Sequence, residues 1–274
     1  MANTDLGQTG ILIRDNQVRA VKLVTHECDG APVDPVEEHR TEVRYKNLGT
    51  EITEAQLEAI RSGTFDDLYV GDYWVLDGKV QRIVDIDYYY GKEGTGAETT
   101  HHLVVLPDIG QSGQTVAMHD TSDDPLLVEG MHYCDTDMCK TKMATYQTQV
   151  EALVGADHML QMTKRIGDRS YEAKLWLMCL VNFVGEQALV IPSFEEQAGI
   201  TYPFSYPDDD RRFALFAHSR RFDSDATAGT WFTDTVSGGG YPYFAGVLYL
   251  GYLFAYRADR SNSAGVRAAY LLIA

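Results

Sequence analysis

The chain has 274 residues, of which 45% are hydrophobic and 23% are charged, a composition typical of a globular protein rather than a disordered one. Its formal net charge of -17 argues against nucleic acid or an anionic membrane as a partner. The four cysteines are too few for a disulfide-rich scaffold, so we expect free thiols and assembly in a reducing cytoplasm.

Residues 1–50 show no apolar pattern that could build a core of its own. They also lack the basic and apolar segments of a secretion signal. Ile11–Ile13 and Val18–Val24 could each form a short strand, whereas Asp29–Arg40 is rich in proline and acid and is typical of a loop. We therefore expect residues 1–50 to be an extended attachment arm, and residues 51–274 to form the main domain.

The main domain begins with signals for a helix and a hairpin. Thr53 and Gln56 fit a capping box, and Gly63 is suited to end the helix that follows. The dipeptide Asp77–Gly78 separates two strand-like runs, which predicts a hairpin. The strands expected in this region are Tyr73–Leu76, Lys79–Ile86, His102–Leu106 and Thr115–His119.

Two helices are expected in the middle of the chain, over 136–154 and Tyr171–Val184. The first is predicted by one apolar face at spacings of four and three, made of Cys139, Met143, Tyr146, Val150 and Leu153. Short strands are expected afterwards, at Leu189–Pro192, Phe213–Phe216, Tyr243–Leu250, Tyr252–Arg257 and Val266–Leu272. This order predicts an α+β fold, with a twisted antiparallel sheet flanked by two main helices.

No motif assembles a catalytic or metal site. His101 and His102 are adjacent in an expected strand, where they would point to opposite faces and could not share one metal ion. His132, Cys134 and Cys139 resemble half of a zinc site, but no second half follows at a workable spacing. We therefore expect no cofactor, no metal and no enzymatic activity.

The C-terminal third is rich in tyrosine and glycine. This composition is typical of adaptable recognition surfaces, although sheets also favour tyrosine in their cores. Both interpretations stay open. If the domain recognises a ligand, the contact is expected between Trp231 and Gly265, through Tyr241, Tyr243, Tyr249, Tyr252, Tyr256, Asp259 and Asn262.

Three strings in this domain resemble known families. SGTFDDLYVGDYW at Ser62–Trp74 is similar to a signature of uncharacterised proteins of Firmicutes phages and prophages, and that likeness runs over residues 50–274. WFTDTV at Trp231–Val236 and GVRAAYLLI at Gly265–Ile273 resemble the ending of C-type-lectin-like domains related to formylglycine-generating enzyme and phage tropism determinants. The resemblance implies a C-type-lectin-like domain over residues 51–274.

The resemblance also implies which residues are structural, namely Trp74, Trp231, Gly265 and Arg267. Arg267 is expected to anchor the final strand by hydrogen bonds rather than to contact a ligand. Ala268 and Thr233 stand where the ending usually carries Pro and Arg. The sugar-binding EPN and WND motifs are absent, and so are paired cysteines near the C-terminus. Sugar binding and catalysis are therefore not implied.

The expected function is that of a structural protein of a tailed bacteriophage virion, most naturally a capsid decoration or head-fibre protein exposed on the virion surface. Residues 1–50 would bind other virion proteins of the capsid or tail. A homo-oligomer is expected, and a trimer would match a threefold site. One alternative is a tail or baseplate receptor-binding protein that recognises a host surface ligand. Another is an enzyme acting on cell-wall glycans, which would need two facing carboxylates.

Overall fold

The residues that the computed structural model describes are 9–14, 17–22, 35–110, 115–128, 130–166, 169–185, 211–218, 229–236, 241–247, 253–259 and 263–274. The strands are β1 (Thr9–Arg14), β2 (Gln17–Lys22), β3 (Tyr73–Leu76), β4 (Lys79–Ile86), β5 (Leu103–Pro107), β6 (Met162–Ile166), β7 (Arg169–Ala173), β8 (Leu175–Leu177), β9 (Thr230–Val236), β10 (Tyr243–Val247), β11 (Leu253–Arg257) and β12 (Ala268–Leu272). The α-helices are α1 (Pro35–Thr41), α2 (Glu54–Ser62), α3 (Met143–Val154), α4 (Leu180–Val184) and α6 (Ala214–His218). Two 3-10 turns, η1 (Tyr133–Asp135) and η3 (Ala156–His158), and a π-helical turn, η2 (Met138–Lys142), complete the described elements.

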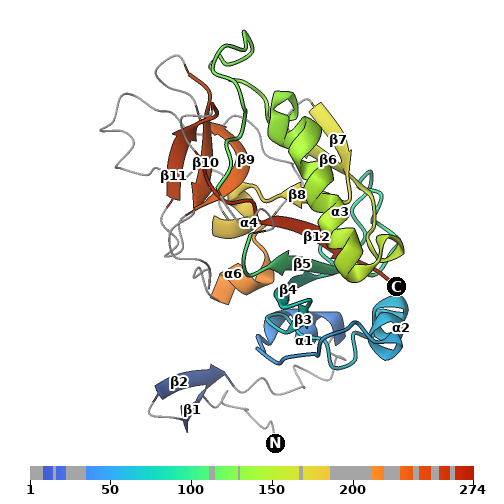
Figure 1. Ribbon diagram of the computed structural model, residues 1–274. Coiled ribbons are helices and arrows are strands. Elements are labelled where there is room, and N and C mark those ends of the chain that lie inside the picture. Colours follow the sequence, from blue (N-terminus) through green and yellow to red (C-terminus); the bar gives the residue numbers. More distant parts are fainter. Residues whose placement is uncertain are drawn as a thin grey trace, which may run out of the picture.

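A five-stranded antiparallel sheet forms the centre of the fold, in the order β3-β4-β5-β12-β8 (Figure 1). The C-terminal strand β12 is therefore central, with Tyr270 opposite Val105 on one side and Leu175 on the other. A second antiparallel sheet has the order β11-β10-β9. The architecture is α+β with antiparallel sheets and few helices, as the sequence predicts.

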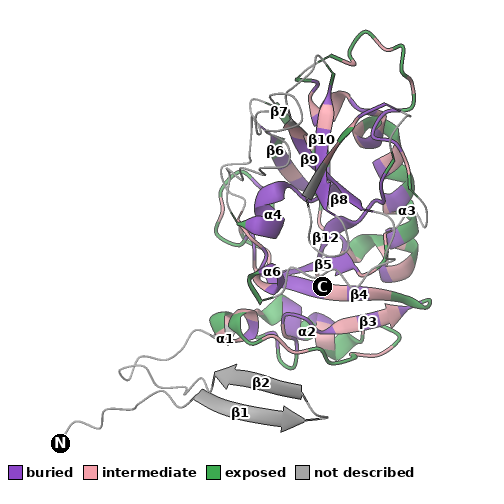
Figure 2. Ribbon diagram, turned by 90° about the vertical axis from the view of Figure 1, so that its left-hand side faces the viewer, coloured by how far each residue is buried: buried purple, intermediate pink, exposed green. Residues whose placement is uncertain are grey.

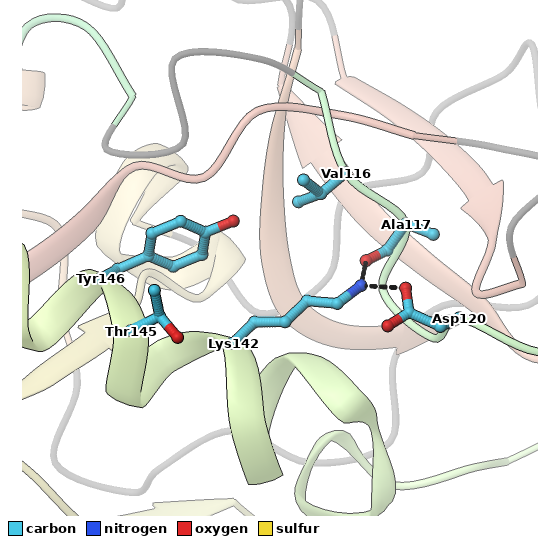
Figure 3. Close-up of a pocket in the computed structure, with 6 residues that line it drawn as sticks. All are labelled: Val116, Ala117, Asp120, Lys142, Thr145 and Tyr146. Carbon is cyan, nitrogen blue, oxygen red and sulfur yellow. Dashed lines mark hydrogen bonds and ion pairs between the residues drawn. The ribbon is translucent and has the colours of Figure 1, made fainter.

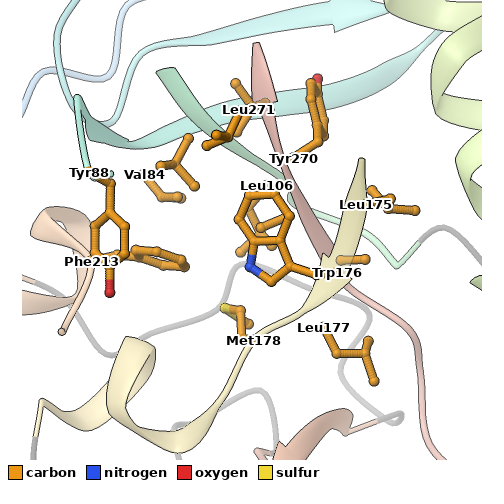
Figure 4. Packing of buried hydrophobic residues seen from close by; sticks show 14 of the residues in the cluster. Val84, Tyr88, Leu106, Leu175, Trp176, Leu177, Met178, Phe213, Tyr270 and Leu271 are labelled. Carbon is orange, nitrogen blue, oxygen red and sulfur yellow. The ribbon is translucent and has the colours of Figure 1, made fainter. Parts of the chain in front are cut away.

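Both faces of the central sheet are covered. Every residue of β5 and β12 is buried, which is expected of strands packed on two faces rather than one. Figure 2 shows α3 on one side of these strands and α4 and α6 on the other. Trp176 of β8 is fully buried and lies among Leu106, Tyr270 and Met178 (Figure 4). The central sheet is thus the main hydrophobic core of the described structure.

The helix and hairpin expected near the start of the domain are confirmed. In the capping box of α2, the Gln56 N–H donates to Thr53 Oγ1 at 3.3 Å, and the Thr53 N–H donates to Gln56 Oε1 at 2.9 Å. Gly63 ends the helix with a φ of 70°, a conformation that costs glycine little. The hairpin strands β3 and β4 have the predicted bounds and turn at Asp77–Gly78.

The prediction of a second main helix over Tyr171–Val184 is wrong. This segment instead contains part of β7, all of β8 and the five-residue helix α4. Leu175, Trp176 and Leu177 are all buried, whereas a helix lying on a sheet would turn one of three successive residues outward. A continuous apolar run suits a doubly covered strand as well as a buried helix, so its pattern could not distinguish the two. The described fold therefore has one principal helix, α3, preceded by η2.

Other local predictions are also corrected. The expected strand Phe213–Phe216 is the start of α6, where Asp85 accepts a hydrogen bond from the Ala214 N–H at 2.9 Å. The expected loop Asp29–Arg40 ends in α1, which starts with Pro35 in the first helical position, a favourable place for proline. Thr115–His119 contributes only an isolated bridge to Ala264. The expected strand Leu189–Pro192 lies outside the described residues.

The packed structure also begins before residue 51. Val43 and Asn47 form parallel bridges with Val70 and Tyr73, and Val43 packs against the core together with Val36. The segment from residue 36 to residue 48 is therefore part of the domain surface rather than of an extended arm. Ahead of it, β1 and β2 form an antiparallel hairpin that shares no sheet with any other strand in the described ranges.

Candidate functional site

The predicted recognition residues lie on the three-stranded sheet or at its ends. Tyr243 is on β10, Tyr256 is on β11, and Tyr241 and Asp259 flank these two strands. The structure describes four of the seven candidates. The remaining three, Tyr249, Tyr252 and Asn262, lie outside the described residues.

Tyr241, Arg257 and Asp259 form one connected group. The Arg257 guanidinium lies 3.6 Å from the centre of the Tyr241 ring, a cation–π contact. On its other side, Arg257 Nη2 makes a 2.7 Å ion pair with Asp259 Oδ2. Asp259 is buried, whereas 45% of Tyr241 is exposed. The buried Asp259 therefore positions Arg257 from the interior side. Together, Tyr241 and Arg257 present an aromatic and cationic surface.

The strand register divides the candidate tyrosines between two faces. Tyr243 pairs with Arg257, and paired residues of antiparallel strands point to the same face. Tyr256 is the next residue along β11 and so points to the opposite face. There its ring meets Trp231 edge-on at 6.1 Å. Tyr243 therefore lies on the face of Arg257, and the candidates do not form one continuous tyrosine patch.

Arg257 is the residue that the sequence analysis missed. A signal was present, because Arg257 and Asp259 are two residues apart in an extended stretch and can share a face. We refer to Tyr241, Tyr243 and Arg257 as the β10–β11 surface.

The four motif residues lie in the interior rather than at a ligand site. The indole N–H of Trp231 donates to the Val116 carbonyl at 2.8 Å, and its backbone N–H donates to the Gly265 carbonyl at 3.1 Å. The indole N–H of Trp74 donates to Gln56 Oε1 at 3.0 Å. Arg267 is buried, and its Nε–H donates to the Pro107 carbonyl at 2.8 Å. This contact ties the chain just before β12 to the end of β5.

A cavity of about 340 Å³ lies between the helical segment η2–α3 and the chain at residues 116–120. Figure 3 shows Lys142 reaching across it, with its ammonium between the Ala117 carbonyl, at 2.8 Å, and the Asp120 carboxylate. Burial, with a contribution from the Asp120 charge, raises the pKa of Tyr146 at the other end. Because Lys142 is engaged by Asp120, the cavity offers a ligand little uncompensated charge. Its lining residues are Val116, Ala117, Asp120, Lys142, Thr145 and Tyr146.

The adjacent histidines His101 and His102 make separate hydrogen bonds within the fold. His101 Nδ1 lies 2.7 Å from Asp87 Oδ2, whereas His102 Nδ1 donates to the Thr100 carbonyl and its Nε2 accepts from the Tyr89 N–H. Within the described ranges, no three His, Cys, Asp or Glu side chains are grouped so that they could hold a metal ion. The helices described there include none that is long and apolar enough to cross a bilayer.

Comparisons with known proteins identify no relative of this chain. No protein-family model matches the chain, and neither the curated proteins nor the solved structures give a match.

Proposed function

We propose that this chain is a structural protein of a tailed-phage virion, in which N-terminal residues hold a C-type-lectin-like domain on the particle surface. The proposal rests on the resemblance of Ser62–Trp74 and of the C-terminal strings to phage proteins and lectin-like domains. The structural observation that supports it best is the way in which the segment 35–48 is fastened to the domain.

Two buried carboxylates fasten this segment. Asp85 of β4 accepts from Arg40 Nε at 2.8 Å, and Asp72 accepts from Arg44 Nη2 at 2.6 Å. Neither carboxylate side chain is exposed to solvent. Removing the arginine of such a pair would leave a buried carboxylate with backbone donors but without its closest cation, so the pairs hold the segment firmly. A pulling force on the residues before Pro35 would thus be transmitted through Arg40 and Asp85 to strand β4 of the central sheet.

The residues before this segment are suited to attachment. The hairpin β1–β2 pairs with no other described strand. Edge strands with unused backbone groups pair readily with a strand of a neighbouring chain. We infer that residues 1–34 bind another virion protein or a second copy of this chain. Closed symmetry is the usual result for copies, and a trimer fits a threefold capsid site.

A deletion experiment tests this attachment. Phage particles lacking the gene would be assembled in hosts that express either the full chain or a variant without residues 1–34. The truncated protein is expected to melt at the temperature of the full chain but to be missing from purified particles. Its normal incorporation would refute attachment through these residues, and absence of the full chain from particles would refute the virion role.

A longer deletion provides the structural control. Removing residues 1–40 also removes Arg40 and so leaves the buried Asp85 without its 2.8 Å partner. We expect this variant to melt at a lower temperature than the deletion of residues 1–34. Equal melting of the two truncations would show that Arg40 does not fasten the segment, and the argument from the buried carboxylates would fall.

A tail or baseplate receptor-binding protein is the second candidate, and one observation favours it. Tyr241, which is exposed, and Arg257, which is partly exposed, form an aromatic and cationic pair that Asp259 holds in place. Tyrosine and arginine are frequent among residues that supply most of the binding energy at interfaces. The β10–β11 surface would then contact the host ligand, while residues 1–34 would attach to the tail.

A further inference from the structure

The cavity beside α3 has one wall from the helical stretch η2–α3 and the other from the chain at residues 116–120. The helical wall presents three side chains at spacings of three and four residues, which lie on one face of a helix, namely Lys142, Thr145 and Tyr146. Its volume of about 340 Å³ falls within the range of ~300–1,000 Å³ that is typical of small-molecule sites. The cavity therefore has room for one small molecule.

The wall at residues 116–120 is held by backbone hydrogen bonds. The Val116 N–H donates to the Ala264 carbonyl at 2.8 Å, and the Ala264 N–H donates back to the Val116 carbonyl at 3.1 Å. The Met118 carbonyl accepts from the Met138 N–H at 3.0 Å, and since Met138 belongs to η2, this bond joins the two walls. The cavity is thus preformed, and a ligand would not have to order either wall.

The Tyr146 hydroxyl is the feature that points to a ligand. Tyr146 is only 8% exposed, and Figure 3 shows its ring extending from α3 with the hydroxyl directed into the cavity. In the part of the chain that the structure describes, no group makes a hydrogen bond to this hydroxyl. Buried polar groups nearly always have a partner, so a partner for this one is expected inside the cavity. Burial raises the pKa of Tyr146, so the hydroxyl keeps its proton and can donate as well as accept.

Lys142 and Asp120 set the charge that a ligand would meet. Lys142 Nζ donates to the Ala117 carbonyl at 2.8 Å and to the Asp120 carboxylate, and these contacts use two of the three ammonium protons. Asp120 contacts Lys142 through Oδ1, and its side chain is 67% exposed, so Oδ2 can accept from a ligand. The ion pair is neutral as a whole, and it therefore favours a neutral polar ligand over a charged one.

We propose that this cavity binds one neutral sugar ring. Ring hydroxyls match a carboxylate oxygen, an ammonium proton and the Tyr146 hydroxyl, which lie around one small space. Val116 and the Tyr146 ring offer apolar surface to the C–H groups of the sugar. The net charge of -17 further disfavours an acidic ligand. The site shares no residue with the β10–β11 surface, and the inference does not depend on the virion role.

Single sugars added to the purified full chain test the site. Glucose, galactose, mannose and N-acetylglucosamine are the neutral probes, and binding is measured by the transfer of NMR saturation from the protein to the sugar. We expect at least one of them to bind. The uronic acid and the amino sugar of the same ring should bind at least about tenfold more weakly, because each brings a charge against the like charge of Asp120 or Lys142.

Tyr146→Phe separates a ligand site from a packing role. The substitution removes only the hydroxyl, so the melting temperature should not fall. The affinity for the sugar should fall about tenfold, which corresponds to the loss of one hydrogen bond. Tyr90→Phe is the matched control, because it removes the hydroxyl of an exposed tyrosine outside the cavity. This control should bind the sugar as the unaltered chain does.

Asp120→Asn tests the charge balance. The substitution keeps the shape of the side chain but leaves the Lys142 charge without its carboxylate, so the preference should move from the neutral sugar toward the uronic acid. Methyl glycosides distinguish two sources of the ligand: retained binding indicates the end of a glycan chain, and lost binding indicates a free sugar. The proposal would be overturned by no saturation transfer to any neutral sugar, by unchanged affinity in Tyr146→Phe, or by an unchanged preference in Asp120→Asn.

Discussion

The segment Ser62–Trp74 and the three-stranded sheet β9–β11 use their side chains differently. In the first, Asp72 is fully buried and binds Arg44, which also binds Asp67. In the second, Tyr241 is 45% exposed. The first segment is thus fastened inside the domain, whereas the second region carries an exposed aromatic surface. A distinctive string therefore need not mark a ligand site.

Two carboxylates, Asp72 and Asp67, bind the same arginine, Arg44, and substituting each in turn tests how the segment is fastened. Asp72 accepts hydrogen bonds from Arg44, from the Lys46 N–H at 2.8 Å and from the Tyr69 N–H at 3.2 Å. We expect Asp72→Ala to lower the free energy of unfolding by about 3–5 kcal/mol, because Arg44 and two backbone donors lose a buried partner. Denaturation in urea measures this loss.

Asp67→Ala is the matched control for this substitution. Asp67 also binds Arg44, at 2.7 Å, but its side chain is 62% exposed and screened by water. We expect its removal to cost only about 0–1 kcal/mol. Similar losses for the two variants would contradict the distinction between a buried fastening at Asp72 and a surface ion pair at Asp67.

A smaller loss of unfolding free energy is expected when Trp231, in the C-terminal region, is substituted. Trp231→Phe removes the hydrogen bond to the Val116 carbonyl, which cannot turn away because Val116 also bridges Ala264. The expected cost is about 1–3 kcal/mol in the free energy of unfolding. Trp74→Phe is the comparison, since its partner is the Gln56 side-chain amide, which can rotate toward water. A larger loss for Trp74→Phe would contradict this ranking.

The dependence of stability on pH should report on His102. Burial lowers the pKa of His102 below its ordinary value of 6.5. As the pH falls below 6.5, the unfolded chain binds a proton that the folded chain does not, so acid destabilises the fold. The loss should approach about 1.4 kcal/mol per pH unit until the folded pKa is reached.

A substitution at His102 identifies the source of this loss. His102→Gln should flatten the fall in unfolding free energy between pH 7 and pH 5. An unchanged slope in His102→Gln would show that another group governs the acid sensitivity of the domain.

Local signals in the sequence predicted the elements that short-range chemistry determines. The capping box at Thr53 and the turn at Asp77–Gly78 act within a few residues, so their elements have the predicted bounds. Tyr171–Val184 failed because its strand depends on pairing with β12, almost a hundred residues away. The Phe213 region failed for the same kind of reason, since the buried Asp85 caps α6 from β4.

The candidate sites show the same limit. The sequence placed the aromatic surface between Trp231 and Gly265, but only strand register shows that Tyr243 and Tyr256 point to opposite faces. The sequence groups His132, Cys134 and Cys139 as half of a zinc-like pattern, but the described residues contain no group of side chains that could hold a metal ion. Cys134 lies in the 3-10 turn η1 and Cys139 in the π-helical turn η2, and neither turn has a clear sequence signal.

The smallest expected change in stability concerns the β10–β11 surface. Tyr241 is exposed and contacts Arg257 mainly through its ring face, so Tyr241→Ala should change the free energy of unfolding by no more than about 0.5 kcal/mol. In a decoration protein, host adsorption of particles carrying this variant should also be unchanged. Tyr256→Ala, on the opposite face of β11, is the matched control. Lost adsorption with Tyr241→Ala alone, at unchanged melting, would favour the receptor-binding alternative, because only the face of Arg257 would then matter. Equal loss with both variants would contradict a one-faced ligand surface.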